Sequence, residues 1–354
     1  MPPKVEAYKQ YPAYKIISIF ALSLFCLLFT VYPQIAQEKQ KRESGHQTKS
    51  EPAPQKARNT AINESGFKIG VSVDVVLLYA SVFDKDGRFV SGLEKKDFRL
   101  FEDGVEQEIL SFTQEDVPVS MGILLDLSGS MRPKYDQVVK AARAFIQASN
   151  PQDEVFLIGF NDEVELLLDY SNDFDEISDA LENTTTTGAT ALYDAVYLGV
   201  QKAQTGTKTK KAVVVISDGQ DSQSYYSIDE MIAKVRESDV QVFCVGFLDE
   251  KPKKTFFGSY KDAELGKSYE ALQHISKETG AKAFFPYNIE DIHSIVAEIA
   301  SEIRSQYSIS YMSSNTARDG TFRRIKVAFE GKDDDIHLRY RRGYYAPKAS
   351  ITKK

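Results

Sequence analysis

Residues 119–131 (VSMGILLDLSGSM) constrain the fold of this chain more than any other stretch. An apolar run ends in Asp126, Ser128 and Ser130, which occupy alternate positions. Side chains at alternate positions of an extended segment point the same way, so these three oxygens can converge. In parallel α/β sheets, ligands bind at the carboxyl ends of the strands, and oxygen ligands suit a hard cation such as Mg²⁺. The stretch therefore predicts a buried strand that ends at a cation site.

Strand-like and helix-like segments alternate from residue 118 to residue 305. The expected strands are 121–126, 154–160, 164–168, 212–216, 240–247 and 283–285, and the expected helices are 133–149, 174–181, 191–203, 228–237, 269–279 and 289–305. Asn161-Asp162 predicts a hairpin that gives the sheet an antiparallel edge. The pattern predicts an α/β fold, a doubly wound and mostly parallel sheet with helices on both faces. Residues 249–268 are polar and lysine-rich, which predicts a surface loop.

Segments rich in β-forming residues flank this region on both sides. Strands are expected within residues 67–115 before it, and at 307–311, 322–329 and 336–340 after it. About fifty residues bury little core alone, so we expect the two segments to pair in a small β-sandwich-like module.

The N-terminal residues have the features of an export signal. Lys4, Lys9 and Lys15 precede an apolar run at 16–31, and Ala36 is a plausible cleavage position. The run is shorter than the ~20 residues of a usual membrane span, which favours a cleaved signal, although an uncleaved anchor is the alternative. The polar, proline-containing stretch that follows predicts a disordered linker.

The predicted organisation therefore has five parts. They are a signal peptide or N-terminal anchor (1–36), a linker (37–66), an N-terminal β segment (67–116), the α/β domain (117–306) and a C-terminal β segment (307–346). We expect the body of the chain to be exported, as a periplasmic, secreted or membrane-anchored protein. The membrane is expected as a partner only through the anchor, and the formal net charge of −7 argues against nucleic acid.

Two later loops add oxygen atoms to the predicted site. Residues 188–194 (GATALYD) place Thr190 at the start of a helix, and Asp218 follows the apolar strand at 212–216. Each motif alone has a structural explanation, because aspartate, serine and threonine are also common in turns and helix caps. All three motifs in this order favour a metal site. Asp162, Asp194 and Asp221 lie near the same edge, and their role is left open.

The combination of Asp126-x-Ser128-x-Ser130, Thr190 and Asp218 resembles the metal-ion-dependent adhesion site of von Willebrand factor type A domains. The resemblance covers residues 119–305. It implies that Ser128, Ser130 and Thr190 supply hydroxyl ligands, and that Asp126 and Asp218 hold the ion, often through water. The implied ion is Mg²⁺, with Mn²⁺ or Ca²⁺ as alternatives.

The flanking β segments resemble those of an acidobacterial family of secreted von Willebrand A-related proteins. The stretches that carry this likeness are 97–104 (DFRLFEDG) and 341–345 (RRGYY). The likeness implies a bacterial, exported protein, and it adds architecture more than function.

The expected function is Mg²⁺-dependent protein binding, in adhesion or as a scaffold. Neutral hydroxyl ligands leave much of the ion's charge uncompensated, so it attracts an Asp or Glu carboxylate of a protein partner. One alternative is a scaffold that the metal only braces, with the β module making the partner contacts. Another is a metal-dependent hydrolase.

The sequence gives little support to an enzyme, and we expect no catalytic residues. Ser128 occupies the position where phosphoryl transfer through an aspartyl intermediate would place a second carboxylate. The four histidines lie outside the site loops, and neither G-x-S-x-G nor GxxxxGK[ST] occurs.

Overall fold

The computed structural model describes residues 75–255, 258–288, 291–331 and 335–348. The predicted export signal, the linker and residues 67–74 lie outside these ranges, and the expectations for them stay predictions. None of the described helices is both long enough and apolar enough to span a membrane.

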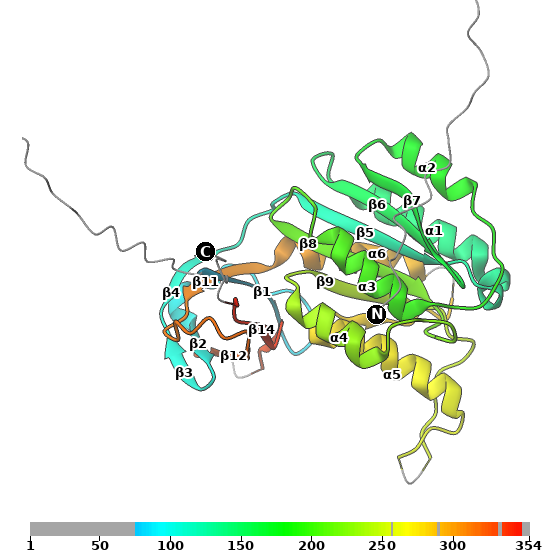
Figure 1. Ribbon diagram of the computed structural model, residues 1–354. Coiled ribbons are helices and arrows are strands. Elements are labelled where there is room, and N and C mark those ends of the chain that lie inside the picture. Colours follow the sequence, from blue (N-terminus) through cyan, green and yellow to red (C-terminus); the bar gives the residue numbers. More distant parts are fainter. Residues whose placement is uncertain (1–74, 256–257, 289–290, 332–334, 349–354) are drawn as a thin grey trace, which may run out of the picture. The chain divides into compact units, whose positions relative to one another are not determined.

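The central element is a six-stranded sheet (Figure 1). Its strands are β5 (Val119–Asp126), β6 (Glu154–Phe160), β7 (Val164–Ser171), β8 (Lys210–Ser217), β9 (Gln241–Gly246) and β10 (Ala283–Phe284). Their order is β10-β9-β8-β5-β6-β7, and the β6–β7 hairpin is antiparallel whereas the other pairs are parallel. The predicted doubly wound, mostly parallel sheet with one antiparallel edge is therefore confirmed.

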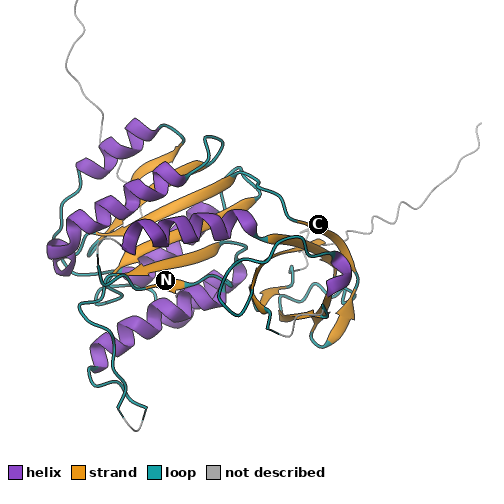
Figure 2. Ribbon diagram, turned by 180° about the vertical axis from the view of Figure 1, so that it is seen from behind, coloured by secondary structure: helices purple, strands orange, loops and turns teal. Residues whose placement is uncertain are grey.

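Helices cover both faces of this sheet (Figure 2). The cluster of buried apolar residues on one face includes α1 (Tyr135–Ala148), α2 (Phe174–Glu182) and α6 (Asp291–Ser305). The other face packs against α3 (Leu192–Ala203), α4 (Ile228–Glu237) and α5 (Ala263–Glu278). Because both faces are covered, the inner strands are continuous apolar runs, and all eight residues of β5 are buried.

The topology explains why the end of β5 is a natural binding position. After β5 the chain crosses to β6 on one side, and it later returns to β8 on the other side of β5. Ligands of open α/β sheets bind where the strand order reverses in this way, outside the carboxyl ends of the strands. Asp126 is the last residue of β5 and therefore stands at this position.

The flanking strands form two further four-stranded sheets that share one core. One has the order β13 (His337–Tyr340), β1 (Val75–Phe83), β11 (Tyr307–Met312) and β4 (Ile109–Thr113). The other has the order β14 (Gly343–Tyr345), β12 (Phe322–Phe329), β2 (Phe98–Glu102) and β3 (Val105–Gln107). Leu78 and Ile309, from opposite ends of the chain, are register partners, so the expected pairing of the two β segments is observed.

Several element boundaries differ from the prediction. The helix expected at 269–279 begins at Ala263, because the Asp262 side chain accepts a hydrogen bond from the Leu265 N–H at 2.9 Å and caps it. The polar loop therefore ends at residue 262 rather than 268. The helix expected from residue 133 begins at Tyr135, since Pro133 lies in a preceding 3₁₀ turn, η2 (Gly129–Lys134).

The short elements η1 (Lys95–Asp97), β3 and β14 were not predicted. Segments of three residues are too short to show a hydrophobic period, so pairing with neighbouring strands defines β3 and β14.

Candidate metal site

The two predicted carboxylates lie at the same edge of the sheet. Asp126 ends β5, and Asp218 directly follows the last residue of β8. β5 and β8 are parallel neighbours, with Leu125 opposite Ile216. Both side chains are almost fully enclosed, with 0% of Asp126 and 4% of Asp218 exposed.

The first loop brings the Ser128 and Ser130 hydroxyls together, although Ser130 lies in the 3₁₀ turn η2 and not in extended backbone as expected. The Ser128 N–H donates to Asp126 Oδ1 at 3.0 Å, and the hydroxyl oxygens of Ser128 and Ser130 are 3.1 Å apart. Ser128 is buried whereas Ser130 is exposed. The loop therefore extends from the buried Asp126 carboxylate to the protein surface.

Ser217 is a participant that the sequence reasoning missed. Its hydroxyl donates to Asp126 Oδ2 at 2.6 Å and accepts from the Gly219 N–H at 2.9 Å. These two bonds fix the orientation of the Asp126 carboxylate and connect it to the loop that carries Asp218. The signal in the sequence was a serine between an apolar strand and an aspartate, which is too common to single out.

Backbone hydrogen bonds join the Thr190 loop to the other two loops. The Gly129 N–H donates to the Gly188 carbonyl oxygen at 3.0 Å. The Thr190 carbonyl oxygen accepts from the N–H groups of Ser222 and Gln223, at 2.9 and 3.0 Å. The loops that carry all five predicted ligands are thus connected in space, and the Thr190 side chain is buried.

Neither Thr190 nor Ser128 serves as a side-chain helix cap. The N-cap of α3 is Ala191, and Ser128 precedes η2 without a capping hydrogen bond from its side chain. Asp218 does stabilise a turn, because its Oδ1 accepts from the Gln220 N–H at 3.0 Å. A role in turns or helix caps therefore explains one contact of the Asp218 carboxylate. It does not explain why the hydroxyls of Ser128 and Thr190 are buried at this edge.

The electrostatics of the site favour a cation. Burial raises the pKa of Asp126 to about 6, against the hydrogen bonds from Ser128 and Ser217, and the nearby Asp218 raises it further. No lysine or arginine in the described ranges forms an ion pair with Asp126 or Asp218. Burying two ionised carboxylates without a cationic partner lowers the free energy of unfolding, and a bound divalent ion would offset that loss.

The chemistry of the donor set fits Mg²⁺ rather than a softer metal. All five predicted ligands are oxygens, as hard cations require. No group of three or more His, Cys, Asp or Glu in the described part of the chain is arranged to hold a metal. A metal site at this edge therefore depends on the hydroxyl oxygens as well as on the two carboxylates.

Two of the three acidic residues left open by the sequence, Asp194 and Asp221, brace these loops. The Asp194 carboxylate accepts from the N–H groups of Tyr225 and Tyr226, at 2.9 and 2.8 Å. Asp221 Oδ1 accepts from the Tyr193 N–H at 3.2 Å. Both carboxylates thereby hold the residues after Asp218 against the start of α3.

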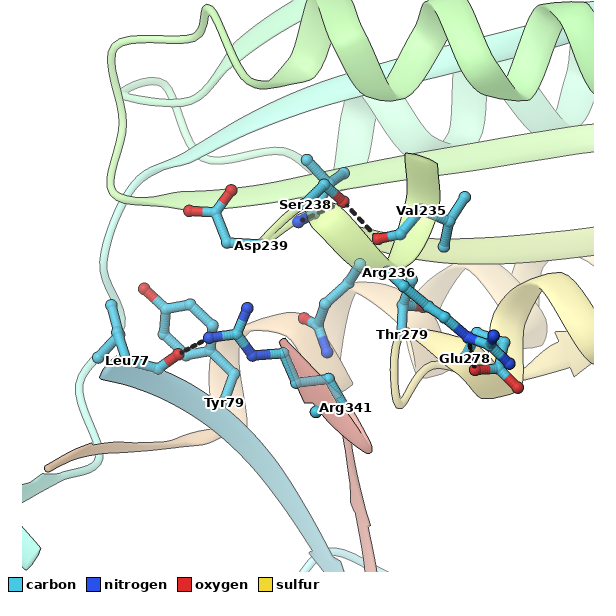
Figure 3. Close-up of a pocket in the computed structure, with 12 residues that line it drawn as sticks. Leu77, Tyr79, Val235, Arg236, Ser238, Asp239, Glu278, Thr279 and Arg341 are labelled. Atoms are coloured by element: carbon cyan, nitrogen blue, oxygen red, sulfur yellow. Dashed lines mark hydrogen bonds and ion pairs between the residues drawn. The ribbon is translucent and has the colours of Figure 1, made fainter. Parts of the chain in front are cut away.

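A small polar pocket lies at the amino end of β9, between β1 and α4 (Figure 3). Arg341 reaches into it, and its Nη2 donates to the Leu77 carbonyl oxygen at 2.7 Å. The volume of this pocket, about 20 Å³, is close to that of a single water site, so the pocket is too small for an organic ligand. We assign it to packing between the β segments and the α/β domain.

Comparisons with known proteins agree with this architecture. The von Willebrand factor type A domain, as a family, matches residues 121–301. A search of curated proteins found no match.

Among solved structures, similar chains include an aerotolerance-related membrane protein from Bacteroides fragilis (21% identity, 52% of this chain, 98% of that chain, TM-score 0.42). The von Willebrand factor domain of the type V pili tip protein Mfa5 from Porphyromonas gingivalis is 11% identical, over 53% of this chain and 95% of that chain, with a TM-score of 0.43. A von Willebrand factor type A protein from Catenulispora acidiphila is 13% identical, over 79% of this chain and 75% of that chain, with a TM-score of 0.44. Likenesses at this level do not bear on function. The family match spans half of the sequence and coincides with the six-stranded sheet and its helices, and the chain belongs to the von Willebrand factor type A domain family.

Proposed function

We propose that this chain is an exported, divalent-cation-dependent protein-binding module. Domains of its family are generally protein-interaction or adhesion modules. The observation that carries the proposal is the pair of enclosed carboxylates, Asp126 and Asp218, beside buried hydroxyls and without a described cationic partner. The preferred ion is Mg²⁺, and catalysis is not part of the proposal.

The residues of the site have distinct roles in this proposal. Asp126, held by Ser217, supplies negative charge in a fixed orientation. Ser128, Ser130 and Thr190 supply neutral oxygens, which leave part of the ion's charge uncompensated. A divalent ion held in this way would attract an Asp or Glu carboxylate of a protein partner from outside the sheet edge.

A Mg²⁺-dependent gain in stability tests the metal site itself. With a dissociation constant of about 0.1 mM, 1 mM Mg²⁺ would stabilise the fold by roughly 1.4 kcal/mol. Asp126→Ala should abolish this gain, whereas Asp136→Ala, at an exposed position of α1, should keep it. Thermal unfolding of the three proteins with Mg²⁺ and with EDTA measures the effect. A full Mg²⁺ response in Asp126→Ala would contradict the site.

Partner capture separates adhesion through the ion from a metal-braced scaffold. If the ion contacts the partner, EDTA and Ser128→Ala should both weaken a pull-down from a bacterial envelope, and added Mg²⁺ should restore it for the unsubstituted chain. If the β module makes the contacts, Ser128→Ala should lower stability but leave the captured protein unchanged. Mass spectrometry of the captured band then identifies the partner.

A further inference from the structure

An open groove of about 680 Å³ lies between residues 251–254 and Tyr260 of the polar loop, α5 and the segment that follows β10. Figure 1 shows this yellow loop extending away from the sheet beside α5. The groove is lined by aromatic and lysine side chains, chiefly Tyr260, Tyr269, Phe285, Lys251, Lys254 and Lys282. We call it the lysine–aromatic groove. Phe285 packs partly on the core of the sheet, whereas Tyr260, Lys251 and Lys254 belong neither to that core nor to the proposed metal ligands.

The groove adjoins the loop that carries Asp218. Gly219 packs so closely on α5 that a Cβ atom there would lie 2.7 Å from the Ser268 carbonyl oxygen. Tyr269, which follows Ser268 in α5, lines the groove. The Asp218 loop therefore packs on the same helix that supplies Tyr269 to the groove.

A second connection links the groove to the first site loop. Lys134, the last residue of η2, donates to the Phe247 carbonyl oxygen at 2.7 Å and forms an ion pair with Asp249 at 2.6 Å. These residues begin the loop that carries Lys251 and Lys254. The base of the loop is therefore attached to the segment that follows Ser130.

Tyr260, Tyr269 and Phe285, which we call the aromatic wall of the groove, pack against one another. The rings of Tyr269 and Phe285 are 4.4 Å apart, and those of Tyr260 and Tyr269 are 6.4 Å apart. Tyr287, at the rim, is 46% exposed. Aromatic side chains that are held in place and accessible are typical anchors of protein–protein interfaces.

Three lysines in the described ranges line the groove in a chain whose formal net charge is −7, and one of them, Lys282, is paired with Glu298 at 2.6 Å. Among the described residues, neither Lys251 nor Lys254 forms an ion pair, and Asp291 is the only carboxylate that lines the groove. The Lys254 ammonium lies 5.0 Å from the centre of the Tyr260 ring. The ammonium groups of Lys251 and Lys254 can therefore donate hydrogen bonds to carboxylates of a partner.

The groove also borders the outermost strand of the described sheet. β10 is the outermost strand, and its two residues, Ala283 and Phe284, line the groove. A segment in extended conformation presents alternate side chains to opposite sides. Acidic side chains could then meet the lysines while apolar ones meet the aromatic wall.

We propose that the lysine–aromatic groove binds an acidic, extended peptide segment of the protein partner, in which acidic and apolar residues alternate. The proposal rests on the proposed function in one respect, that the same partner supplies the carboxylate to the ion. The groove contacts themselves do not require a metal, so the two proposals can fail separately.

Fluorescence anisotropy with two labelled ten-residue peptides tests the groove. One peptide alternates glutamate and leucine, and the other has glutamine in place of glutamate. In 50 mM salt with Mg²⁺, the full chain should bind the glutamate peptide at least tenfold more tightly than the glutamine peptide. Lys251→Glu/Lys254→Glu should weaken glutamate-peptide binding at least tenfold, and added salt should reduce this difference.

The matched control is Lys267→Glu/Lys277→Glu, which reverses two exposed lysines of α5 that do not line the groove. It should change the affinity less than twofold. Equal weakening by both double variants would show a general effect of net charge, and equal binding of both peptides would show a merely apolar surface. Either result would overturn the groove proposal.

Mg²⁺-dependent unfolding of the same proteins separates the two proposals. Lys251→Glu/Lys254→Glu should keep the full Mg²⁺ stabilisation. Unchanged peptide binding by that variant, with the Mg²⁺ response intact, overturns the groove and leaves the metal site standing. A chain that binds the glutamate peptide through these lysines but shows no Mg²⁺ response supports the groove and contradicts the proposed function.

Discussion

Ser217 determines how the Asp126 carboxylate is presented at the sheet edge. Its hydroxyl is fully buried and makes one bond to Asp126 and one to the Gly219 backbone. Removing it leaves a buried carboxylate oxygen and a backbone N–H without their partner. Unmade hydrogen bonds in buried surroundings cost about 1–3 kcal/mol each, and those to charged groups lie at the upper end.

Ser217→Ala should therefore lower the free energy of unfolding by about 2 kcal/mol in EDTA and also weaken Mg²⁺ binding. Urea unfolding gives the first quantity, and Mg²⁺ titration followed by thermal unfolding gives the second. Ser111→Ala, an exposed serine of β4, is the control and should change stability by less than about 0.5 kcal/mol. Mg²⁺ affinity equal to that of the unsubstituted chain would exclude a positioning role for Ser217.

Gly188 is required by both its backbone conformation and its surroundings. Its φ of +79° belongs to the left-handed region, and a Cβ there would lie 1.9 Å from Asp162 Oδ1. Gly92 has nearly the same φ, +78°, but nothing within 4 Å of an added Cβ.

Gly92→Ala should therefore cost about 1 kcal/mol from backbone strain alone. Gly188→Ala should cost more and also weaken Mg²⁺ binding, because the loop that carries Thr190 must move. Urea unfolding and Mg²⁺ titration of the two variants, compared side by side, isolate the effect of the contact with Asp162. Equal losses in both variants would show that the contact with Asp162 is unimportant.

At this scale, the sequence predicts the oxygen atoms but not what orients them. The order of the motifs places Asp126, Ser128 and Asp218 after strand ends and Thr190 before a helix, which follows from local pattern and known sheet topology. Ser217 contacts Asp126, and Gly188 lies against Asp162. Both contacts join segments that are distant in the chain. Such contacts leave no period or motif that a single sequence can reveal.

Among the elements, α5 shows the same limit. The sequence suggests a loop as far as residue 268 because the first turns of α5 are mainly polar and include Gly266. A Cβ at Gly266 would lie 2.4 Å from the Tyr260 ring, so this glycine is required by packing against the preceding loop. The inner strands of the sheet, in contrast, are predictable because burial on both faces makes them continuous apolar runs.

β8 begins with a buried charge that should make stability depend on pH. Lys210 is 1% exposed, and its ammonium donates to the Ile303 carbonyl oxygen at 2.6 Å. Burial lowers the pKa of Lys210 to about 8. The charge of Asp116 raises this pKa, and the charge of Arg304 lowers it further. Between this value and the unfolded value near 10.5, the unfolded chain binds more protons at this group, so its contribution to stability rises with pH.

We expect Lys210→Met to remove this dependence. From pH 7.5 to pH 9.5, the stability of the unsubstituted chain relative to Lys210→Met should rise by about 2 kcal/mol. Urea unfolding of both proteins at the two pH values measures this difference, because the effects of all other groups are shared. A constant difference would show that Lys210 titrates as in the unfolded chain.

For the molecule as a whole, an ion pair between a buried carboxylate and a partly exposed arginine connects the α/β domain to the flanking β strands. Glu302 of α6 is fully buried. Its carboxylate accepts from Arg339 Nη2 of β13 at 2.7 Å and from the Ser81 hydroxyl of β1 at 3.0 Å. Residues 72–354 form one compact unit, so loss of this pair should affect the stability of the entire unit.

Arg339→Met leaves the Glu302 carboxylate buried without its cation, which should cost about 3 kcal/mol or more in a single cooperative unfolding transition. In a Glu302→Gln background the same substitution should cost at least 1 kcal/mol less, since no charge is left unpaired. Burial already raises the pKa of Glu302 and Arg339 opposes this rise, so lowering the pH to 5 should recover part of the loss in Arg339→Met as Glu302 takes up a proton. Arg88→Met, which breaks an exposed ion pair with Asp84, should cost less than about 1 kcal/mol at either pH. Equal costs for the two arginine substitutions, or two separate unfolding transitions, would contradict coupling between the β strands and the α/β domain through Glu302.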